Sequence, residues 1–447
     1  MKNKRTARQK AIIKRRIFLS ICALALAGII AISAVVISSI LPDKNDGNSS
    51  PSPSLSDSAE KDKTPKIVSS ATVISTGDIM VHSTQLDGAK TADGGYDFSA
   101  FFKETSAYYK KHDLAVANLE VTFGGTESGK YSGYPAFNCP DVLADNIKKS
   151  GLNLLLTTNN HSYDTGLFGL KRTVQILKNR KIGFLGTKET ENDPKFLVKD
   201  INGIKIGMVS YSYETTGSDQ SRKYLNGNII SKDANNLINT FSYQHINDFY
   251  IEAENVINDM KAQGADFIVF YMHWGEEYQL SANTWQKSIA QKLSNLGVQM
   301  ILGGHPHVIQ PIDLIHSEDG QTDTICLYSM GNAVSNQRQE IMNPECTTGH
   351  TEDGLMFSYK LEKYSNGDIV LSNINVIPTW VDRYRGGSGY QYTIYPLEKA
   401  DDGSVKYGLT GTAATKSYNS YNRTKALLKD GLTKCQQHIG CDITFKD

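Results

Sequence analysis

This 447-residue chain has few cysteines and lacks the signature motifs of several enzyme classes. It contains 6 Cys and no CxxC pair, which argues against a disulfide framework and excludes a zinc-finger module. It also lacks a GxxxxGKS/T phosphate-binding loop and a GxSxG nucleophile elbow, which excludes the enzyme classes built on those motifs. The 39% of hydrophobic residues still suffice for the core of one large domain or of two to three ordinary ones. Cys435 and Cys441 remain candidates for one short disulfide loop in an oxidising compartment.

Charge is balanced over the whole chain but not along it. The 47 Lys and Arg residues equal the 47 Asp and Glu residues in number, yet residues 1–16 hold eight basic residues and no acidic one. The rest of the chain therefore has a net charge of −8. Residues 17–41 contain no charged residue, and a helix of that length crosses a hydrocarbon core of roughly 30 Å. We predict a single-pass membrane anchor at 17–41, with the basic segment 1–16 in the cytoplasm and the main domain outside it.

A cleaved signal peptide is the alternative to the anchor, although its apolar region is usually only about 7–15 residues long. Both alternatives export the main domain. The basic N-terminus is explained by this topology, so nucleic-acid binding has no independent support. Residues 42–66 are rich in Ser, Pro, Asp and Lys and almost free of large apolar residues, which predicts a flexible linker.

From residue 67 onward, apolar runs of strand length alternate with segments of helical period. Strands are expected at 71–79, 113–121, 153–158, 196–199, 205–211, 267–272, 298–302, 312–315, 324–328, 356–361 and 369–376. Helices are expected at 143–150, 166–180, 251–263, 284–296 and 422–432. This alternation predicts layered α/β architecture rather than a β-sandwich or a helical bundle. We expect one main domain at 67–380 and a C-terminal extension at 381–447 that packs on it.

Polar residues follow five of the expected strands at their C-terminal ends, where open α/β sheets bind ligands. These residues are Asp78, Glu120, Asn160, His161, His273, His305 and His307. Each alone is an ordinary cap, turn or half-buried residue, but five such ends in one chain indicate a shared metal centre. Carboxylate, amide and imidazole ligands suit Mn²⁺, Zn²⁺ or Fe²⁺, and the number of ions is one or two.

The Gly303-Gly304-His305-Pro306-His307 segment is the most informative of these strand ends. Two glycines allow the backbone to approach its neighbours closely, because neither has a Cβ atom. Proline favours an extended conformation for the residue before it. We therefore expect an extended His305, from which both imidazoles face one metal.

Six motifs follow one another along the main domain: GDIMVH at 77–82, NLE at 118–120, NNHSYDTG at 159–166, HWGEEY at 273–278, GGHPHVIQP at 303–311 and YSMGN at 328–332. In this order they resemble the signatures of the CapA-type poly-γ-glutamate capsule synthesis family, whose members are relatives of the calcineurin-like metallophosphoesterases. The resemblance covers about residues 72–380. It implies a four-layer α/β/β/α sandwich of metallophosphoesterase type, with a metal-binding edge between the two sheets.

The resemblance also implies a role for each residue of the centre. Glu120 would bridge two ions. Asp78 and His307 would bind the first ion, and Asn160, His273 and His305 would bind the second. His161 would be the general acid. The chain departs from the phosphoesterase pattern twice, because Met80 stands where an imidazole is usual and Glu120 where Asp is usual. His82 is a candidate replacement ligand, and Asp164 and Glu277 are candidate accessory residues.

Three functions are compatible with these features. The leading one is a membrane-anchored, extracytoplasmic protein in the synthesis or export of an anionic surface polymer, poly-γ-glutamate by resemblance. Its expected partners are that polymer and other membrane proteins of a polymer synthase. The alternatives are an envelope metallohydrolase acting on phosphoester or amide bonds, and a non-catalytic polymer-binding module on a degenerate metallophosphoesterase scaffold. The net charge of −8 argues against strong overall attraction to a polyanion.

Overall fold

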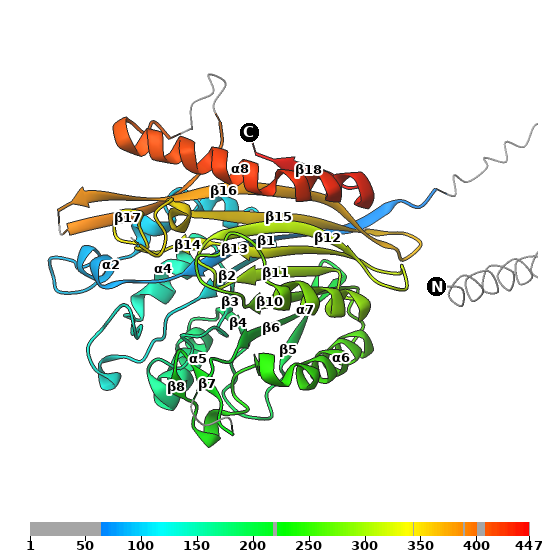
Figure 1. Ribbon diagram of the computed structural model, residues 1–447, viewed down its shortest axis with the longest axis horizontal. Helices are drawn as coiled ribbons and strands as arrows, with labels where there is room; N and C mark the ends of the chain where they lie inside the picture. Colours follow the sequence, from blue (N-terminus) through cyan, green and yellow to red (C-terminus); the bar gives the residue numbers. More distant parts are fainter. Residues whose placement is uncertain (1–63, 218–220, 343, 388, 400–406, 447) are drawn as a thin grey trace, which may run out of the picture. The chain divides into compact units, whose positions relative to one another are not determined.

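The computed structural model describes residues 64–217, 221–342, 344–387, 389–399 and 407–446 (Figure 1). The expected cytoplasmic segment 1–16, the anchor 17–41 and nearly all of the linker 42–66 lie outside the described residues. Among the residues that are described, no helix combines the length and the apolar character needed to span a bilayer. The chain from Thr64 onward clusters as one unit, and its first strand begins at Ile67, where the sequence predicts the start of the main domain.

The first sheet has the strand order β17-β16-β15-β1-β2-β3-β4, with β14 paired to β1 and β18 to β16. Its strands are β1 (Ile67–Ile79), β2 (Leu114–Leu119), β3 (Leu154–Leu156), β4 (Gly183–Leu185), β14 (Asn332–Val334), β15 (Asp353–Tyr364), β16 (Ile369–Gly386), β17 (Gly389–Pro396) and β18 (Asp442–Phe445). The strands β1 to β4 run parallel, whereas β15, β16 and β17 form an antiparallel meander beside β1. The parallel part therefore places the C-terminal ends of β1, β2 and β3 at one edge.

The second sheet has the order β12-β13-β11-β10-β6-β5, with β9 paired to β6. Its strands are β5 (Phe196–Ile201), β6 (Ile204–Tyr213), β9 (Thr240–Phe241), β10 (Phe267–His273), β11 (Met300–Gly304), β12 (Ile309–His316) and β13 (Asp323–Met330). The expected hairpin at Asn202-Gly203 is confirmed: Ile201 pairs with Ile204, and both turn residues have positive φ. A separate small hairpin joins β7 (Tyr224–Leu225) to β8 (Asn228–Ile229).

The two sheets pack face to face, and helices cover their outer faces. Alternate residues of β1 point to opposite sides: Val73 packs in the core between the sheets, and Ile74 packs under the helices. The helices on the first sheet's outer side include α2 (Ser83–Gly88), α3 (Ser106–Tyr109), α4 (Val142–Ser150) and α5 (Gly166–Asn179); those on the second are α6 (Ile246–Ala262) and α7 (Thr284–Asn295). This is the helix, sheet, sheet, helix layering expected.

The short 3₁₀ helices lie in the connections: Ser99–Phe102, Thr126–Ser128, Lys232–Ala234, Tyr243–His245 and His350–Glu352.

The C-terminal region differs from the expectation. Helix α8 spans Gly411–Ile439, 29 residues, rather than 422–432. Its buried face outside that range consists mainly of small or polar residues, so the hydrophobic period is weak there, and Gly440 ends the helix in the left-handed conformation. Figure 1 shows α8 lying along β16, and Leu428 of α8 joins the core between the sheets. The expected boundary at 380/381 falls inside β16. The two cysteines considered for a short disulfide loop, Cys435 and Cys441, are both buried free thiols in the structure.

Candidate metal centre

The ends of five parallel strands bring the predicted polar residues together. From the first sheet come Asp78 near the end of β1, Glu120 directly after β2 and Asn160 after β3; from the second come His273 at the end of β10 and His305 and His307 after β11. All six are buried, with at most 4% of each exposed. Five of them form two groups that could hold a metal ion, and Glu120 belongs to both; a third group joins His305 and His307 to Glu277.

The first half-site consists of Asp78, Glu120 and His307, whose ligand atoms lie within 4.8 Å of one another. The Nδ1 atom of His307 is 3.5 Å from Asp78 Oδ2, and its Nε2 atom is 3.9 Å from Glu120 Oε1. The Nδ1 atom is also 3.1 Å from Asn332 Oδ1. Two carboxylates and one imidazole thus point into the same small volume.

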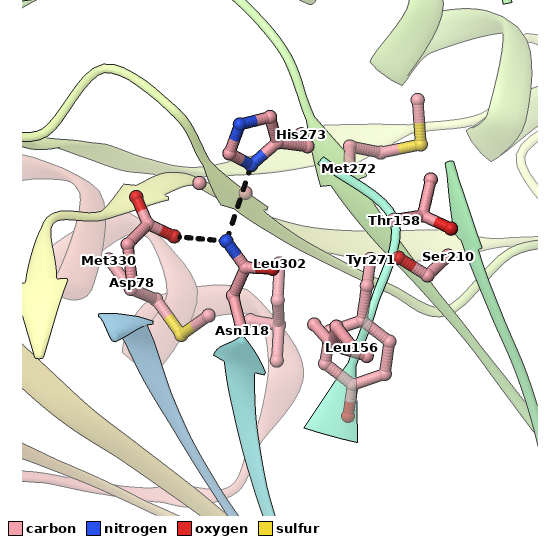
Figure 2. A pocket seen from close by; sticks show the side chains of 12 residues that line it. Asp78, Asn118, Leu156, Thr158, Ser210, Tyr271, Met272, His273, Leu302 and Met330 are labelled. Carbon is pink, nitrogen blue, oxygen red and sulfur yellow. Dashed lines mark hydrogen bonds between the residues drawn. The ribbon is translucent and has the colours of Figure 1, made fainter. Parts of the chain in front are cut away.

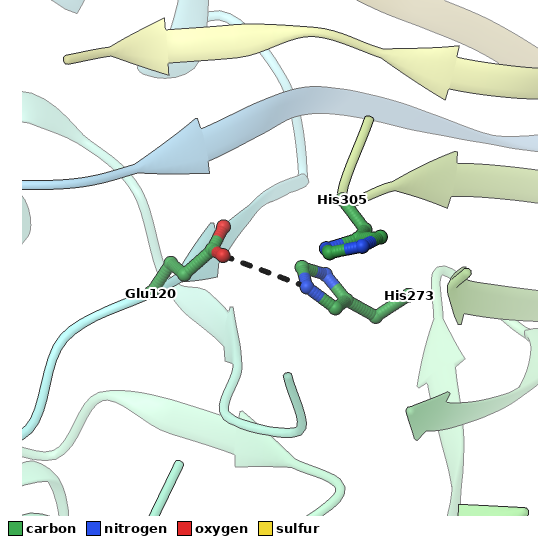
Figure 3. Close-up of side chains that lie close together, drawn as sticks. All are labelled: Glu120, His273 and His305. Atoms are coloured by element: carbon green, nitrogen blue, oxygen red, sulfur yellow. Dashed lines mark ion pairs between the residues drawn. The ribbon is translucent and has the colours of Figure 1, made fainter. Parts of the chain in front are cut away.

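The second half-site consists of Glu120, His273 and His305, again within 4.8 Å, and Asn160 joins it (Figure 3). His273 Nε2 is 3.5 Å from Glu120 Oε1 and 2.8 Å from Asn160 Oδ1. Figure 3 shows the carboxylate of Glu120 facing the rings of His273 and His305 from the opposite side. Glu120 is therefore the only residue common to both half-sites in the part of the chain that the structure describes.

Two buried polar atoms of the centre, Glu120 Oε1 and His305 Nδ1, lack a hydrogen-bond partner. Buried polar atoms nearly always have one. Glu120 and His305 belong to one group of possible metal ligands, so a cation there would provide the missing partner. The donor set of carboxylate oxygens, imidazole nitrogens and an amide oxygen suits a divalent ion such as Mn²⁺, Fe²⁺ or Zn²⁺. The residues of this chain therefore fit the metal that the sequence suggests.

The pKa values of Asp78, His305 and His307 show how the buried charges of the centre act on one another. Burial opposes ionisation of Asp78, but the hydrogen bond to His307 and the charges of the neighbouring imidazoles outweigh it and lower the pKa of Asp78. Burial also disfavours charge on His307, yet the charge of Glu120 and the contacts with Asp78 raise its pKa to about 9. Burial and the charge of His273 hold the pKa of His305 well below its usual range. The centre thus stabilises one positive charge beside its carboxylates, a position that a metal ion takes when it displaces the proton.

An amide shell that sequence reasoning did not assign holds the ligands in place. Asn118 donates from Nδ2 to Asp78 Oδ1 at 2.8 Å, and Figure 2 shows it between Asp78 and His273 beside a small buried cavity. Asn332 donates to the backbone oxygen of His307 at 3.2 Å. The signal for Asn118 was present in the sequence, because residues two apart in a strand share a face and Asn118 precedes Glu120 by two.

His161 lies beside the half-sites and is paired with a carboxylate. Its Nδ1 atom is 2.7 Å from Asp164 Oδ2, and both side chains are buried. Asp164 Oδ2 also accepts from the backbone N–H of Phe137, whose ring packs edge-on against His161 at 4.7 Å. Donation from Nδ1 to Asp164 leaves Nε2 as the ring nitrogen that can hold or release a proton. His161 lines an open cleft of about 350 Å³ together with His307.

The two remaining candidate residues lie in different positions. His82 is in none of the possible metal groups, because the chain turns into α2 directly after it and its Nδ1 atom accepts from the backbone N–H of Asn336 at 3.2 Å. Glu277 is exposed, but its carboxylate lies within 4.8 Å of ligand atoms of His305 and His307. His82 lines the same cleft as Glu277 and His307, so its role as a replacement ligand stays a prediction, whereas Glu277 belongs to a possible metal group.

The backbone expectation for His305 was wrong. His305 and His307 have φ values of 95° and 55°, in the left-handed region rather than the extended one. This conformation turns the backbone N–H of His305 toward Asp78 Oδ2, at 3.2 Å. The close approach expected of the glycines is confirmed, because a Cβ atom on Gly304 would lie 2.7 Å from Asp78 Oδ1.

Comparison with known proteins gives the family. The family described as bacterial capsule synthesis protein PGA_cap matches residues 72–337. The capsule biosynthesis protein CapA of Bacillus anthracis is 24% identical over 287 residues, which cover 63% of this chain and 62% of that protein. The PGA biosynthesis protein CapA of Bacillus subtilis (strain 168) is 25% identical over 232 residues, 52% of each chain. The matches thus span less than two thirds of these relatives.

Among solved structures, the NAD nucleotidase of Haemophilus influenzae is similar with a TM-score of 0.41 and 12% identity, covering 85% of this chain and 57% of that one. That likeness is too distant to carry an argument about this protein. The match over residues 72–337 includes all six residues of the two half-sites together with His161 and Asp164. This chain belongs to the bacterial capsule synthesis protein family PGA_cap.

Proposed function

We propose that this protein is a membrane-anchored, extracytoplasmic metallohydrolase that acts in the synthesis or export of an anionic surface polymer. Membership of the capsule synthesis family supports the polymer, and the CapA relatives in Bacillus make poly-γ-glutamate the leading candidate. The uncharged segment 17–41 behind a basic N-terminus supports the anchor and the placement of the main domain. Other membrane proteins of a polymer synthase are the proposed partners.

One observation carries the hydrolytic part of the proposal. Glu120 is shared by two ligand groups and presents a buried carboxylate oxygen without a donor, next to a complete His161–Asp164 pair. Asp78, Glu120 and His307 would hold one ion, and Asn160, His273 and His305 with Glu120 the other. Bound divalent ions supply electrophilic activation of a carbonyl or phosphoryl oxygen and of the attacking water.

The chain's own residues supply the proton transfer. Asp164 holds the Nδ1 proton of His161, which fixes the ring and leaves Nε2 as its exchangeable position. Because His161 and His307 line the same cleft, a substrate in that cleft contacts both the proton donor and the metal centre. His161 then protonates the leaving oxygen or nitrogen as the general acid. The buried pair with Asp164 favours catalysis over a purely binding role.

The test is hydrolysis by the purified full-length chain in detergent, with and without Mn²⁺, on an activated phosphodiester and on a γ-glutamyl amide. We expect Mn²⁺-dependent turnover on at least one substrate, and a loss of about 10²- to 10⁴-fold in His161→Ala. Glu254→Gln changes an exposed carboxylate on α6 and serves as the matched control. Turnover that survives chelation, or equal losses in both variants, contradicts the proposal. Bound Mn²⁺ without turnover on either substrate favours the polymer-binding alternative.

A further inference from the structure

The two half-sites have unequal numbers of ligands. Each half-site has three possible ligands among its carboxylates and imidazoles, and Asn160 adds an amide oxygen to the second. In the first, Asn332 Oδ1 lies 3.1 Å from His307 Nδ1, where it accepts the ring proton and is not counted as a donor to a metal. Met80, like His82, lines the same cleft as His307. Its thioether is a poor ligand for a borderline or hard divalent ion, so Met80 does not supply the fourth donor.

His82 does not supply it either. A backbone N–H can only donate, so the contact from Asn336 makes Nδ1 of His82 an acceptor. The neutral ring then has its proton on Nε2, and neither nitrogen keeps a free lone pair for a metal. Gln85 Oε1 accepts from the backbone N–H of His82 at 2.8 Å and also lies 3.2 Å from the Nδ1 atom of that ring, so both contacts of the oxygen are to His82.

Glu277 is the carboxylate that reaches the centre from the cleft. It follows β10 by a turn at Gly275, which has a φ of 92°, and the next residue, Tyr278, donates its backbone N–H to Pro306 at 2.8 Å. This hydrogen bond ties the Glu277 loop to the segment between His305 and His307. The ligand atoms of Glu277, His305 and His307 lie within 4.8 Å of one another, and Glu277 lines the cleft.

A second observation points to an ion in the centre beside Glu277, although it concerns His305 of the second half-site; the smaller number of donors in the first half-site, whose His307 lies within 4.8 Å of Glu277, assigns Glu277 to the first. The Nδ1 atom of His305 is buried and has no hydrogen-bond partner, and its residue is only 2% exposed. An exposed carboxylate such as Glu277 retains much of its hydration when it is not bound, so its presence at the mouth of the centre costs little. We propose that Glu277 is a metal ligand that completes the half-site of Asp78, Glu120 and His307 from the cleft side.

The inference rests on the proposed metal centre but goes beyond it. The six residues of the two half-sites are buried, whereas Glu277 is on an exposed loop that shares the cleft with His161. A ligand of this kind binds on the side from which substrate enters. Glu277 therefore sets the occupancy of one ion separately from the other.

The experiment measures Mn²⁺ binding by the full-length chain in detergent, without substrate, by isothermal titration calorimetry and by metal analysis after gel filtration. The wild type is expected to bind two ions. Glu277→Gln is expected to keep one ion and to bind the other at least about tenfold more weakly, because loss of even a supporting contact to a metal ligand has that effect. Glu276→Gln, an exposed neighbour outside the possible metal groups, is the matched control and is expected to behave as wild type.

A second variant tests the position of the ligand. Met80→His in the Glu277→Gln background introduces an imidazole into the cleft that His307 lines and is expected to restore binding of the ion at the first half-site, with folding checked by circular dichroism. Folded protein without restored binding overturns the assignment of Glu277 to that half-site. Wild-type affinities in Glu277→Gln, or equal losses in Glu276→Gln, overturn the inference while the centre itself stands. A wild-type chain that binds no Mn²⁺ overturns the proposed function as well.

Discussion

Two of the buried charged clusters among the described residues differ in whether their carboxylate oxygens all have donors. One is the candidate metal centre; the other, the α8 seam, joins Glu352 and Asp353 to residues of the C-terminal region. In the seam every oxygen of these two carboxylates has a hydrogen-bond or ion-pair donor. Asp353 accepts from Ser420 and Arg423. Glu352 accepts from Gln339, Trp380, Arg338 and Lys416. In the centre, Glu120 Oε1 and His305 Nδ1 have no donor. Burial of charge alone therefore does not mark a functional site. What sets the centre apart is that partnerless atoms of a carboxylate and an imidazole belong to one group of possible metal ligands.

The largest expected change in the free energy of unfolding comes from a substitution in the α8 seam. Arg423→Ala leaves Asp353 buried without its cation, and removal of one partner of a buried ion pair typically costs about 3–5 kcal/mol. We expect the free energy of unfolding in urea to fall by that amount, while the number of bound Mn²⁺ ions per folded chain stays unchanged. Loss of bound metal in folded Arg423→Ala would show that the two clusters are coupled and would remove the contrast between them.

The sequence predicted one cluster and not the other for a physical reason. Asp78, Glu120 and His273 follow apolar runs with a clear strand period, and the parallel arrangement alone brings such ends to one edge. The seam depends on where α8 docks, and the Ser, Thr and Lys residues of that helix give no periodic signal that identifies Asp353 as a partner. The left-handed backbone of His305 was missed because the preference of a residue before proline is local, and here the contact with Asp78 overrides it.

Metal removal should act on the centre alone. At a free Mn²⁺ concentration about 100 times the dissociation constant, binding stabilises the folded chain by about 2.7 kcal/mol. We expect a chelator to lower the unfolding midpoint of the wild type and of Glu352→Gln alike, provided that each is folded. In Glu120→Gln, which changes the residue shared by both half-sites, the chelator should have little effect. A chelator effect of full size in Glu120→Gln would contradict the shared role of that residue.

The two clusters should also respond to pH with opposite sign. Burial raises the pKa of Asp353 to about 6 even though Arg423 and Ser420 act against it, compared with about 3.9 in an unfolded chain. Between about pH 4 and 6 the folded state then binds more protons than the unfolded state, so its stability falls as pH rises through this window and is level above it. The slope is on the order of 1 kcal/mol per pH unit at most.

Asp78 gives the opposite dependence, because its pKa is lowered in the folded state. Its contribution is present above the unfolded pKa and is lost as pH falls through the folded one. The contribution of Asp353 is measured by urea denaturation at pH 4.5 and pH 6.5 with chelator present. It is the difference between the pH dependence of the wild type and that of Asp353→Asn. A wild type whose stability rises over this interval by as much as that of Asp353→Asn would contradict the raised pKa of Asp353.

The smallest effect distinguishes the buried part of the seam from its exposed rim. Lys416 is 3.2 Å from Glu340 and 3.4 Å from Glu352, and its side chain is 29% exposed. Both oxygens of Glu352 keep other donors without it, and ion pairs near the surface contribute less than about 1 kcal/mol. Lys416→Met should therefore lower the free energy of unfolding by less than that amount and leave Mn²⁺ binding unchanged. If its cost equalled that of Arg423→Ala, proximity to the carboxylates would matter more than completeness of their hydrogen bonding, and a missing donor would no longer distinguish the metal centre from the seam.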